Sequence, residues 1–479
     1  MSSHLVSGVT SLRAVAAAPH VDARSLTDIL CALGDVDDLR DLGTRGPLVA
    51  SAGARSLFHC LFGRDSIRMA MDLLGDFPAL ARATVLELAR LQGVRDTVRG
   101  EEEPGRILHE YRAPDDPHAA RLGESWDFPY YGAVDSTPQW INLLVELCAR
   151  GGEEILATTL ADRLGRTLTV RDALVGAVAW LRRRLDDPLG GGFLWVRRAS
   201  PHGIPNQVWE DSGDSYYHED GALFDVTRPY APVAVQGYAY DALLGAADLL
   251  GGRPGRPPSR AYDALRARAA TLRARVLAEF WLPELRTFAH ALTFGAGGRP
   301  RPARVVASGA GHLLASRLLD GEDAAPRRRA LIARFAEGDL LAGAGIRTKA
   351  IGAARFGAGT YHNGSTWPMD TGVVADGLRR HGAIEQADDL EERILRGCAA
   401  VGGFPEFFRG DPDGAIRMNT AIVDRLVDGA LNRLEQPPQA NQGWTATRVW
   451  GILRRRGAID SDVPRRDRVT ASSAPRLGS

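Results

Sequence analysis

The chain has 479 residues, of which 44% are hydrophobic and 25% charged, values typical of a globular protein with a substantial core. Its 59 basic residues balance its 59 acidic ones, which does not favour nucleic acid or an anionic membrane as a partner. No run of about 18 apolar residues occurs, and the N-terminus lacks the basic start of a secretory signal. We therefore expect a cytoplasmic protein without a membrane span.

The cysteines give no sign of a metal cluster. They stand at positions 31, 60, 148 and 398 without a CxxC pair, which predicts buried free thiols in a reducing compartment. The sequence also lacks a GxSxG elbow, a Walker A loop and an HExxH motif. We expect no metal and no organic cofactor.

Helical periodicity recurs along the chain. Apolar residues spaced three and four apart predict helices with one face on a core. These stripes begin at Ile67, Ile141, Leu174, Tyr240 and Ile422, the last continuing through Leu426 and Ala430. Strand patterns are few: GGFLWVRR (191–198) and RTFAHALTF (286–294) predict short strands in loops.

We expect three parts along the chain. Residues 1–54 form an N-terminal extension, weakly structured or with short helices, residues 55–457 form one domain, and the polar tail 458–479 is disordered. About 12 helices fit the middle part, at roughly 33 residues per helix with its loop. The residues suited to chemistry gather in the connections. If they serve one site, the fold must return its loops to one end, as a closed ring of helical hairpins does.

The stretch NQVWEDSGDS (206–215) holds three acids beside a tryptophan. Asp, Ser and Gly all favour turns, so a plain turn is one interpretation. The other is a catalytic acid, because a carboxyl packed against Trp209 in a partly dry cleft has a raised pKa and can hold a proton near neutral pH. Asp211 and Asp214 are the two candidates.

Hydrolysis of a glycoside needs a second carboxylate, as general base or nucleophile. GGFPEFFRG (402–410) supplies Glu406, although a helix or turn start with an incidental glutamate fits the same residues. YHNGSTWPMD (361–370) is either a loop with a core tryptophan or a set of groups suited to a polyhydroxyl ligand. In LFGRDS (61–66), Asp65 either caps the following helix or accepts from sugar hydroxyls.

Taken together, these clusters resemble the glycogen-debranching, amylo-α-1,6-glucosidase-like family of glycoside hydrolases. They are also similar to its relatives among glucoamylases, trehalases, and mannosylglycerate and glucosylglycerate hydrolases. Eight matching stretches occur in the family's order, from residue 62 to residue 408: FGRDS (62–66), GRILHEYR (105–112), YYGAVDSTPQW (130–140), NQVWEDSGDS (206–215), VQGYAYDAL (235–243), GIRT (345–348), YHNGSTWPMD (361–370) and FPEFF (404–408).

The resemblance implies an all-α (α/α)6 barrel, the six-hairpin glycosidase fold, with a few short strands in its loops. It implies inverting hydrolysis of an α-glucosidic bond, with Asp211 as proton donor and Glu406 as the base that activates water. The relatives place their acid two positions after the tryptophan, which favours Asp211 over Asp214. The positions that it implies for sugar binding are Arg64, Asp65, Glu110, Arg112, Trp209, Arg347, His362 and Trp367, to which we add Asp214.

The sequence also departs from the family's pattern. Val208 stands where the family often has glycine, Met369 stands where it often has histidine, and no β-sandwich pattern precedes the helices. A short oligosaccharide or a small glycoside is therefore expected as partner rather than glycogen, and a compatible solute such as glucosylglycerate is an alternative. A sugar-binding barrel without catalysis and a helical scaffold protein also stay open. The sequence carries no signal for an oligomeric state.

Overall fold

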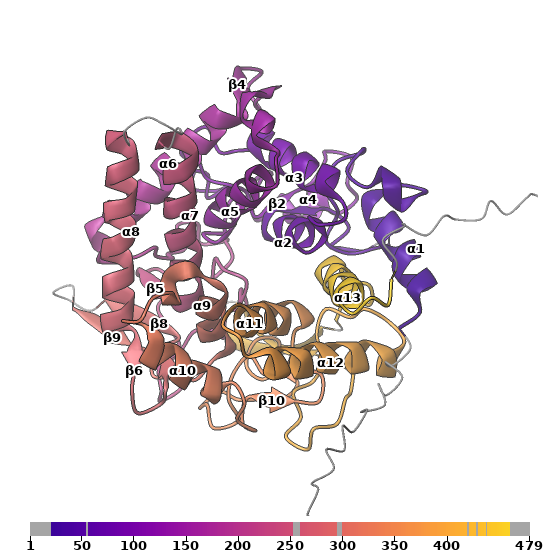
Figure 1. Cartoon of the computed structure of the whole chain (residues 1–479), viewed down its shortest axis with the longest axis vertical. Helices are drawn as coiled ribbons and strands as arrows, with labels where there is room; N and C mark the ends of the chain where they lie inside the picture. Colours follow the sequence, from indigo (N-terminus) through magenta and orange to yellow (C-terminus); the bar gives the residue numbers. More distant parts are fainter. Residues whose placement is uncertain are drawn as a thin grey trace, which may run out of the picture.

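The computed structural model describes residues 21–53, 56–251, 259–294, 299–418, 421–427, 430–436 and 438–459. Within these ranges, six helices form an inner ring (Figure 1). They are α2 (Gly63–Leu73), α5 (Ser136–Ala149), α7 (Val233–Gly251), α9 (His312–Ala315), α11 (Pro368–Arg380) and α13 (Gly443–Arg455). Each contacts the next, and α13 returns to α2. The ring is therefore closed.

A second set of helices surrounds this ring (Figure 1). It consists of α1 (Ala23–Gly34), α3 (Pro78–Arg90), α6 (Val170–Asp186), α8 (Arg260–Glu279), α10 (Ala325–Arg334) and α12 (Ile384–Val401). Helix α1 packs on α13, α3 on α2, α6 on α5, α8 on α7 and α12 on α11. The expected (α/α)6 barrel is confirmed.

Minor elements occupy the connections. The remaining helical segments are α4 (Ala119–Leu122), η1 (Leu39–Asp41), η2 (Glu153–Ala157), η3 (Pro188–Gly190), η4 (Ser308–Gly311) and η5 (Arg317–Leu319). The strands are β1 (Leu61–Phe62), β2 (Glu110–Tyr111), β3 (Thr159–Ala161), β4 (Thr167–Thr169), β5 (Tyr230–Pro232), β6 (Trp281–Leu282), β7 (Thr287–Phe288), β8 (Ala291–Phe294), β9 (Pro300–Pro302), β10 (Leu341–Ala342), β11 (Gly345–Ile346), β12 (Ala421–Val427) and β13 (Ala430–Gln436). All of these pairs are antiparallel. The two-stranded pairs are β1 with β2, β3 with β4, β6 with β7, β10 with β11 and β12 with β13, and β8 pairs with both β5 and β9.

Sequence patterns locate four of the long helices. The stripes at Ile67, Ile141, Leu174 and Tyr240 fall in α2, α5, α6 and α7, and their apolar faces lie in the core. Helix α6 begins with a reciprocal capping box between Thr169 and Asp172, which satisfies backbone donors at its first turn. The predicted helices are confirmed at these four places.

Two local predictions are corrected. The stripe at Ile422, predicted as a helix, forms the hairpin of β12 and β13; Asp-Gly separates two runs rich in branched residues there, and that pair favours two-residue hairpin turns. The stretch 191–198 forms no named strand, and its only pairing is a bridge between Val196 and Tyr230. Phe193, Leu194 and Trp195 are all buried, so the alternation of a half-buried strand is missing. The prediction for 286–294 is confirmed by β7 and β8.

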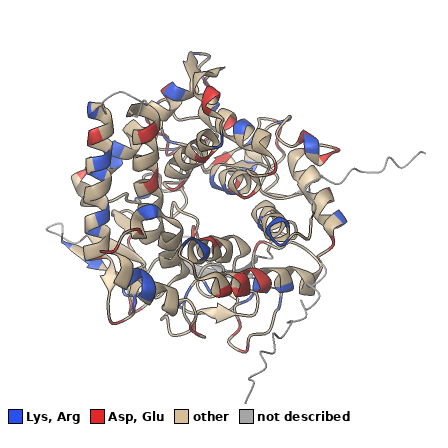
Figure 2. Ribbon diagram, viewed as in Figure 1, with Lys and Arg blue, Asp and Glu red and all other residues tan. Residues whose placement is uncertain are grey.

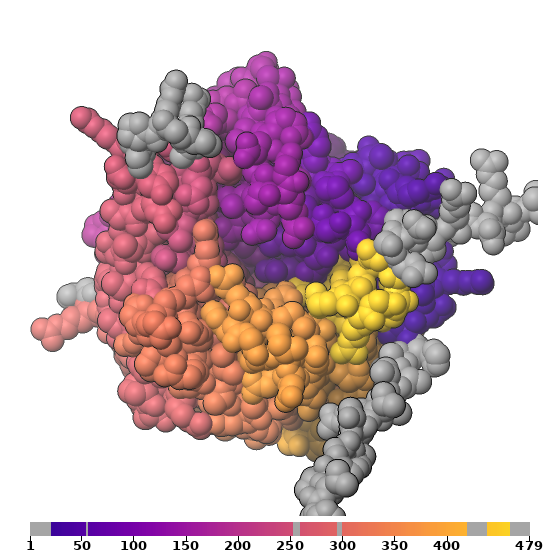
Figure 3. Space-filling model, in the orientation of Figure 1, coloured from indigo at the N-terminus to yellow at the C-terminus, as the bar shows by residue number. Residues whose placement is uncertain are grey.

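The first and last described helices pack together where the ring closes. Helix α1, within the expected N-terminal extension, packs on α13, and Figure 3 shows the earliest and latest described segments side by side. We propose that α1 belongs to the barrel as its sixth outer helix. Residues 1–20, and residues 460–479 of the expected tail, lie outside the described residues.

The surface and interior chemistry of the described residues can be stated briefly. Acidic and basic positions both occur around the ring (Figure 2). All four cysteines are buried and none forms a disulfide. In the described ranges, no helix is long and apolar enough to cross a membrane, and no group of three or more His, Cys, Asp or Glu residues is placed to hold a metal. The cytoplasmic location stays a prediction.

Candidate active site

The chemistry-rich stretches share one place in the fold. They lie at the start of α2 or in the connections that lead from an outer helix to the next inner helix: α3 to α5, α6 to α7, α10 to α11, and α12 to α13. Because the chain alternates between the two layers, these connections reach the ring at the N-terminal ends of inner helices. Partial positive charge at helix N-termini favours carboxylates there. One end of the barrel thus gathers segments far apart in sequence.

Arg64, in the first turn of α2, is the cation at the centre of an acidic cluster. Its guanidinium lies 3.4 Å from a carboxylate oxygen of Asp135, 3.5 Å from one of Asp211 and 3.9 Å from one of Asp65. Arg64, Asp65 and Asp135 are buried. Asp135 was not predicted as a site residue, although YYGAVDSTPQW contains it. Its position just before the inner helix α5 was the available signal.

Asp211 keeps 28% of its side chain exposed beside this buried cluster, so an incoming ligand can reach its carboxyl. Burial raises the pKa of Asp211 to about 7. The Arg64 guanidinium opposes this rise, while the carboxylates of Asp65 and Asp135 add to it. The carboxyl can therefore hold a proton near neutral pH.

Glu406, in the connection from α12 to α13, is buried and held at both oxygens. Tyr361 donates its hydroxyl to Oε1 at 2.5 Å, and the Gln439 N–H donates to Oε2 at 3.2 Å. Burial raises the pKa of Glu406 to about 7, although these two hydrogen bonds act against the rise. The charges of Asp65 and Asp211 raise it further, which places all three acids in one electrostatic cluster. Tyr361 lies in the quoted YHNGSTWPMD stretch but was not predicted as a site residue.

Asp211 and Glu406 are a pair of acids whose pKa values burial raises equally, to about 7. Neighbouring carboxylates favour the protonated form of each, while Arg64 opposes this at Asp211 and the hydrogen bonds from Tyr361 and Gln439 oppose it at Glu406. Coupled acids of this kind can hold one proton between them near neutral pH. The pair therefore offers one protonated and one ionised carboxyl.

An aromatic wall adjoins the acids. The Trp209 ring meets His362 and Trp367 edge to face, at 5.5 and 5.9 Å between centroids, and His362 stacks on Trp367 at 4.9 Å. Trp367 also stacks on Phe407, beside Glu406 in sequence. The indole Nε1 of Trp209 and the Nε2 of His362 are buried without a protein partner. Stacked faces with such polar atoms suit a ligand that carries both C–H surfaces and hydroxyls.

Four other predicted residues bond within the protein. Asp214 is buried and accepts from Asn363 Nδ2 at 2.8 Å and from Ser212 Oγ at 2.9 Å. Arg112 donates to Glu110 at 2.5 Å and forms an ion pair with Asp116. Arg347 donates to five backbone carbonyls, of Gly338, Asp339, Leu341, Gly410 and Asp411. These contacts stabilise the loops around the site.

Gly63 allows α2 to begin where it does. A Cβ at this position would lie 2.1 Å from the backbone oxygen of Leu108. We expect Gly63→Ala to displace the first turn of α2, to cost about 1–3 kcal/mol of stability, and to lower activity by moving Arg64 and Asp65. The matched control is Gly75→Ala, whose Cβ would meet nothing within 4 Å. Equal thermal midpoints and activities for the two variants would contradict this expectation.

The raised pKa of Asp211 predicts a pH-dependent stability. Since the folded-state pKa lies above the unfolded one, the folded state binds more protons between them and loses stability as pH rises from about 4 to about 7. Asp211→Asn removes this loss. Allowing for partial exposure, we expect about 1–2 kcal/mol of stabilisation near pH 8 and none near pH 4. Thermal unfolding across pH measures it, and a Tm difference that does not vary with pH would disprove it.

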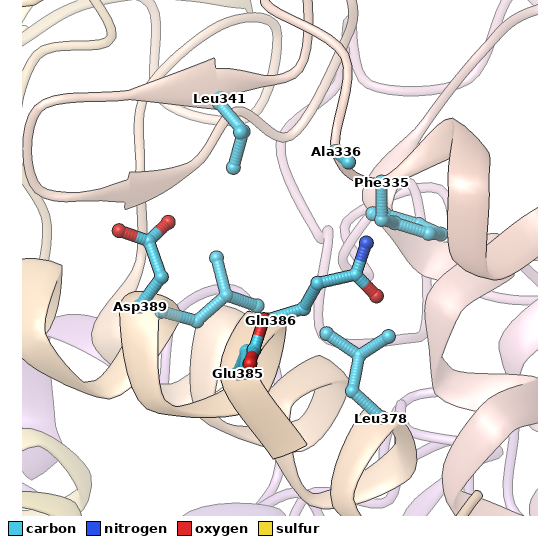
Figure 4. A pocket seen from close by; sticks show the side chains of 8 residues that line it. Phe335, Ala336, Leu341, Leu378, Glu385, Gln386 and Asp389 are labelled. Atoms are coloured by element: carbon cyan, nitrogen blue, oxygen red, sulfur yellow. The ribbon is translucent and has the colours of Figure 1, made fainter. Parts of the chain in front are cut away.

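A separate pocket lies on the outer layer (Figure 4). It has a volume of about 180 Å³ and is lined by Phe335, Ala336, Leu341, Leu378, Glu385, Gln386, Asp389 and Leu390. None of the predicted site residues lines it. It therefore contributes nothing to the arrangement around Asp211 and Glu406.

One family model matches the chain. The family model described as a mannosylglycerate hydrolase MGH1-like glycoside hydrolase domain matches residues 170–418. That range contains Asp211 and Glu406. A search of curated protein sequences finds no match.

Solved structures share the fold. The GH63 mannosylglycerate hydrolase from Thermus thermophilus in complex with Tris and D-glycerate is 14% identical, with a TM-score of 0.57 over 90% of this chain and 99% of that chain. Its complex with glucose gives 14% and 0.56 over the same shares. A further structure, described as a glycosidase, is 16% identical, with a TM-score of 0.52 over 91% of this chain and 98% of that chain.

Proposed function

We propose that this chain, which belongs to the mannosylglycerate hydrolase MGH1-like glycoside hydrolase family, is an inverting glycosidase that cleaves an α-glucosidic bond in a small glycoside. One observation carries the proposal: Asp211 and Glu406 belong to one electrostatic cluster, and burial raises the pKa of each to about 7. Asp211 is partly exposed to an incoming ligand, whereas Glu406 is buried and accepts two hydrogen bonds. Such a pair suits single displacement, which needs one protonated and one ionised carboxyl.

The proposed reaction uses these two groups in one step. Asp211 donates its proton to the glycosidic oxygen as the bond to the anomeric carbon breaks. Glu406 takes a proton from a water that attacks the opposite face of the sugar, so the anomeric configuration inverts. Hydrogen bonds from Tyr361 and Gln439 hold the Glu406 carboxylate in place. Arg64 and Asp65 supply a donor and an acceptor for the sugar hydroxyls, and Trp209 supplies an apolar face.

A neutral aglycone is the first choice for the leaving group. The cations bonded to this cluster, Arg64 and Lys349, are already paired with carboxylates. An anionic aglycone would have to compete with those acids. The second candidate is a glycoside of glycerate, such as mannosylglycerate or glucosylglycerate, which the family match favours.

A product assay tests the proposal. The panel contains maltose, isomaltose, panose, trehalose, limit dextrin, glucosylglycerate and mannosylglycerate, and proton NMR follows the first-formed anomer. We expect turnover of a small α-glucoside with release of the β-anomer. Release of the α-anomer would exclude inversion. Preference for the glycerate compounds would establish the second candidate, and binding without turnover would identify a barrel that has lost catalysis.

A further inference from the structure

Lys349 is the only lysine in a chain with 59 basic residues, all the others being arginine. Its side chain is completely buried, in the segment that follows β11. Its backbone pairs with Ala307. Burial of a charged group costs free energy unless that group is paired and hydrogen-bonded, so its partners define what it does.

The ammonium group holds Glu210, the residue before Asp211. Lys349 Nζ lies 2.5 Å from Oε1 of Glu210, and His290 Nε2 lies 2.6 Å from Oε2. Tyr216 stacks on the His290 ring at 4.3 Å. Lys349 and His290 together hold the pKa of Glu210 well below its usual range, despite its burial. Glu210 therefore stays ionised and is unsuited to donate a proton.

The same ammonium also reaches the residue after Asp211, through one intermediate. Lys349 Nζ donates to the backbone oxygen of His362 at 3.1 Å. The Nδ1 of His362 accepts from the Ser212 N–H at 3.3 Å and lies 2.9 Å from Ser212 Oγ. One buried cation thus ties both neighbours of Asp211 to the segment that carries Tyr361.

We propose that Lys349 is a positioning residue that clamps residues 210–212 and thereby aims the Asp211 carboxyl at the glycosidic oxygen. This inference rests on the proposed function and adds to it a residue that does not touch the substrate. A misplacement of about 1 Å at a catalytic group can cost about 10²-fold in rate. Among the described residues, Asp211 forms an ion pair with Arg64 at 3.5 Å. The direction in which its carboxyl points therefore depends largely on the position of its backbone.

The chemistry of the site explains why lysine stands here rather than arginine. An ammonium is a compact charge with three donors, and this one has two acceptors, on Glu210 and His362. A guanidinium carries five donors in a rigid fork and needs more acceptors and more room. Lys349→Arg, although it keeps the charge, is therefore expected to disrupt the clamp.

The experiment compares four variants of the full chain. Lys349→Arg tests the geometry, Lys349→Met removes the cation, and Lys349→Met with Glu210→Gln removes the buried charges together and protects folding. The matched control is Arg448→Met, which breaks a buried ion pair to Asp72 (2.7 Å) between α13 and α2. The readouts are Tm, kcat and KM on the best glycoside of the panel, and hydrogen exchange of residues 209–215.

We expect the double variant to fold with a Tm near that of the wild type, to lose about 10²-fold in kcat with little change in KM, and to exchange faster in residues 209–215. Arg448→Met should lower Tm while its kcat stays within about threefold of wild type and its 209–215 exchange does not change. Unchanged exchange in the double variant overturns the clamp, and faster exchange with unchanged kcat overturns its role in positioning. If the wild type hydrolyses no glycoside, the proposed function fails, and the exchange measurement alone decides the clamp.

Discussion

Asparagine at position 211 is expected to lower kcat by about 10²–10⁴-fold on substrates with a poor leaving group. Asp211→Asn keeps the shape of the side chain and removes the proton that the glycosidic oxygen requires. A leaving group of low pKa, such as a dinitrophenolate, departs without protonation, so the loss on such a glycoside should be much smaller. Kinetics on a matched pair of α-glucosides, one alkyl and one dinitrophenyl, measure the difference.

Asp214→Asn is the matched control for this result. Asp214 lies in the same loop and is buried between Asn363 and Ser212. Losing one charge there should disturb loop packing and lower kcat by at most about tenfold, equally for both leaving groups. If Asp214→Asn abolished turnover while Asp211→Asn kept most of it, the two roles would be reversed.

Much of this site could be predicted because its residues stand in short local motifs. The order of FGRDS, NQVWEDSGDS and FPEFF carried the family resemblance, and the family match confirms it. The resemblance implied the ring of six hairpins, and the helical stripes and the count of about 12 helices agreed with it. The finer assignments, debranching and amylo-α-1,6-glucosidase activity, stay predictions.

The rest could not be predicted because it depends on contacts between distant segments. Tyr361 donates to Glu406 across 45 residues, and Lys349 meets Glu210 across 139. Partners so far apart in the sequence do not belong to one short motif. The motif that contains Arg347 predicted a residue lining the sugar pocket. In the structure, the Arg347 guanidinium donates to backbone carbonyls, among them those of Gly410 and Asp411. The hairpin of β12 and β13 was predicted as a helix because Ile422, Leu426 and Ala430 are spaced four apart, although Ala430 belongs to the second strand.

Glutamine at position 406 is expected to lower kcat by about 10³-fold, because the attacking water loses its base while Asp211 can still donate its proton. Azide needs no base, and because the negative charge of Glu406 is gone it can take the place of the attacking water and should restore turnover. Single displacement of an α-glucoside would then yield the β-glucosyl azide, which proton NMR identifies. The Asp211→Asn variant should give no such rescue on an alkyl glucoside, since azide cannot protonate the leaving oxygen.

A retaining enzyme would give a different product pattern. Its second carboxyl would act as nucleophile. Azide would then react in the Asp211→Asn variant, after a glycosyl-enzyme intermediate, to give the α-azide.

Tyr361→Phe should have a smaller effect than Glu406→Gln, because it removes one of the two hydrogen bonds that favour ionised Glu406. Its loss should raise the pKa of Glu406 above about 7 and move the acidic limb of the kcat/KM profile to higher pH. If that limb moved to lower pH, or if Asp211→Asn gave the α-azide, Glu406 could not be the base of an inverting reaction.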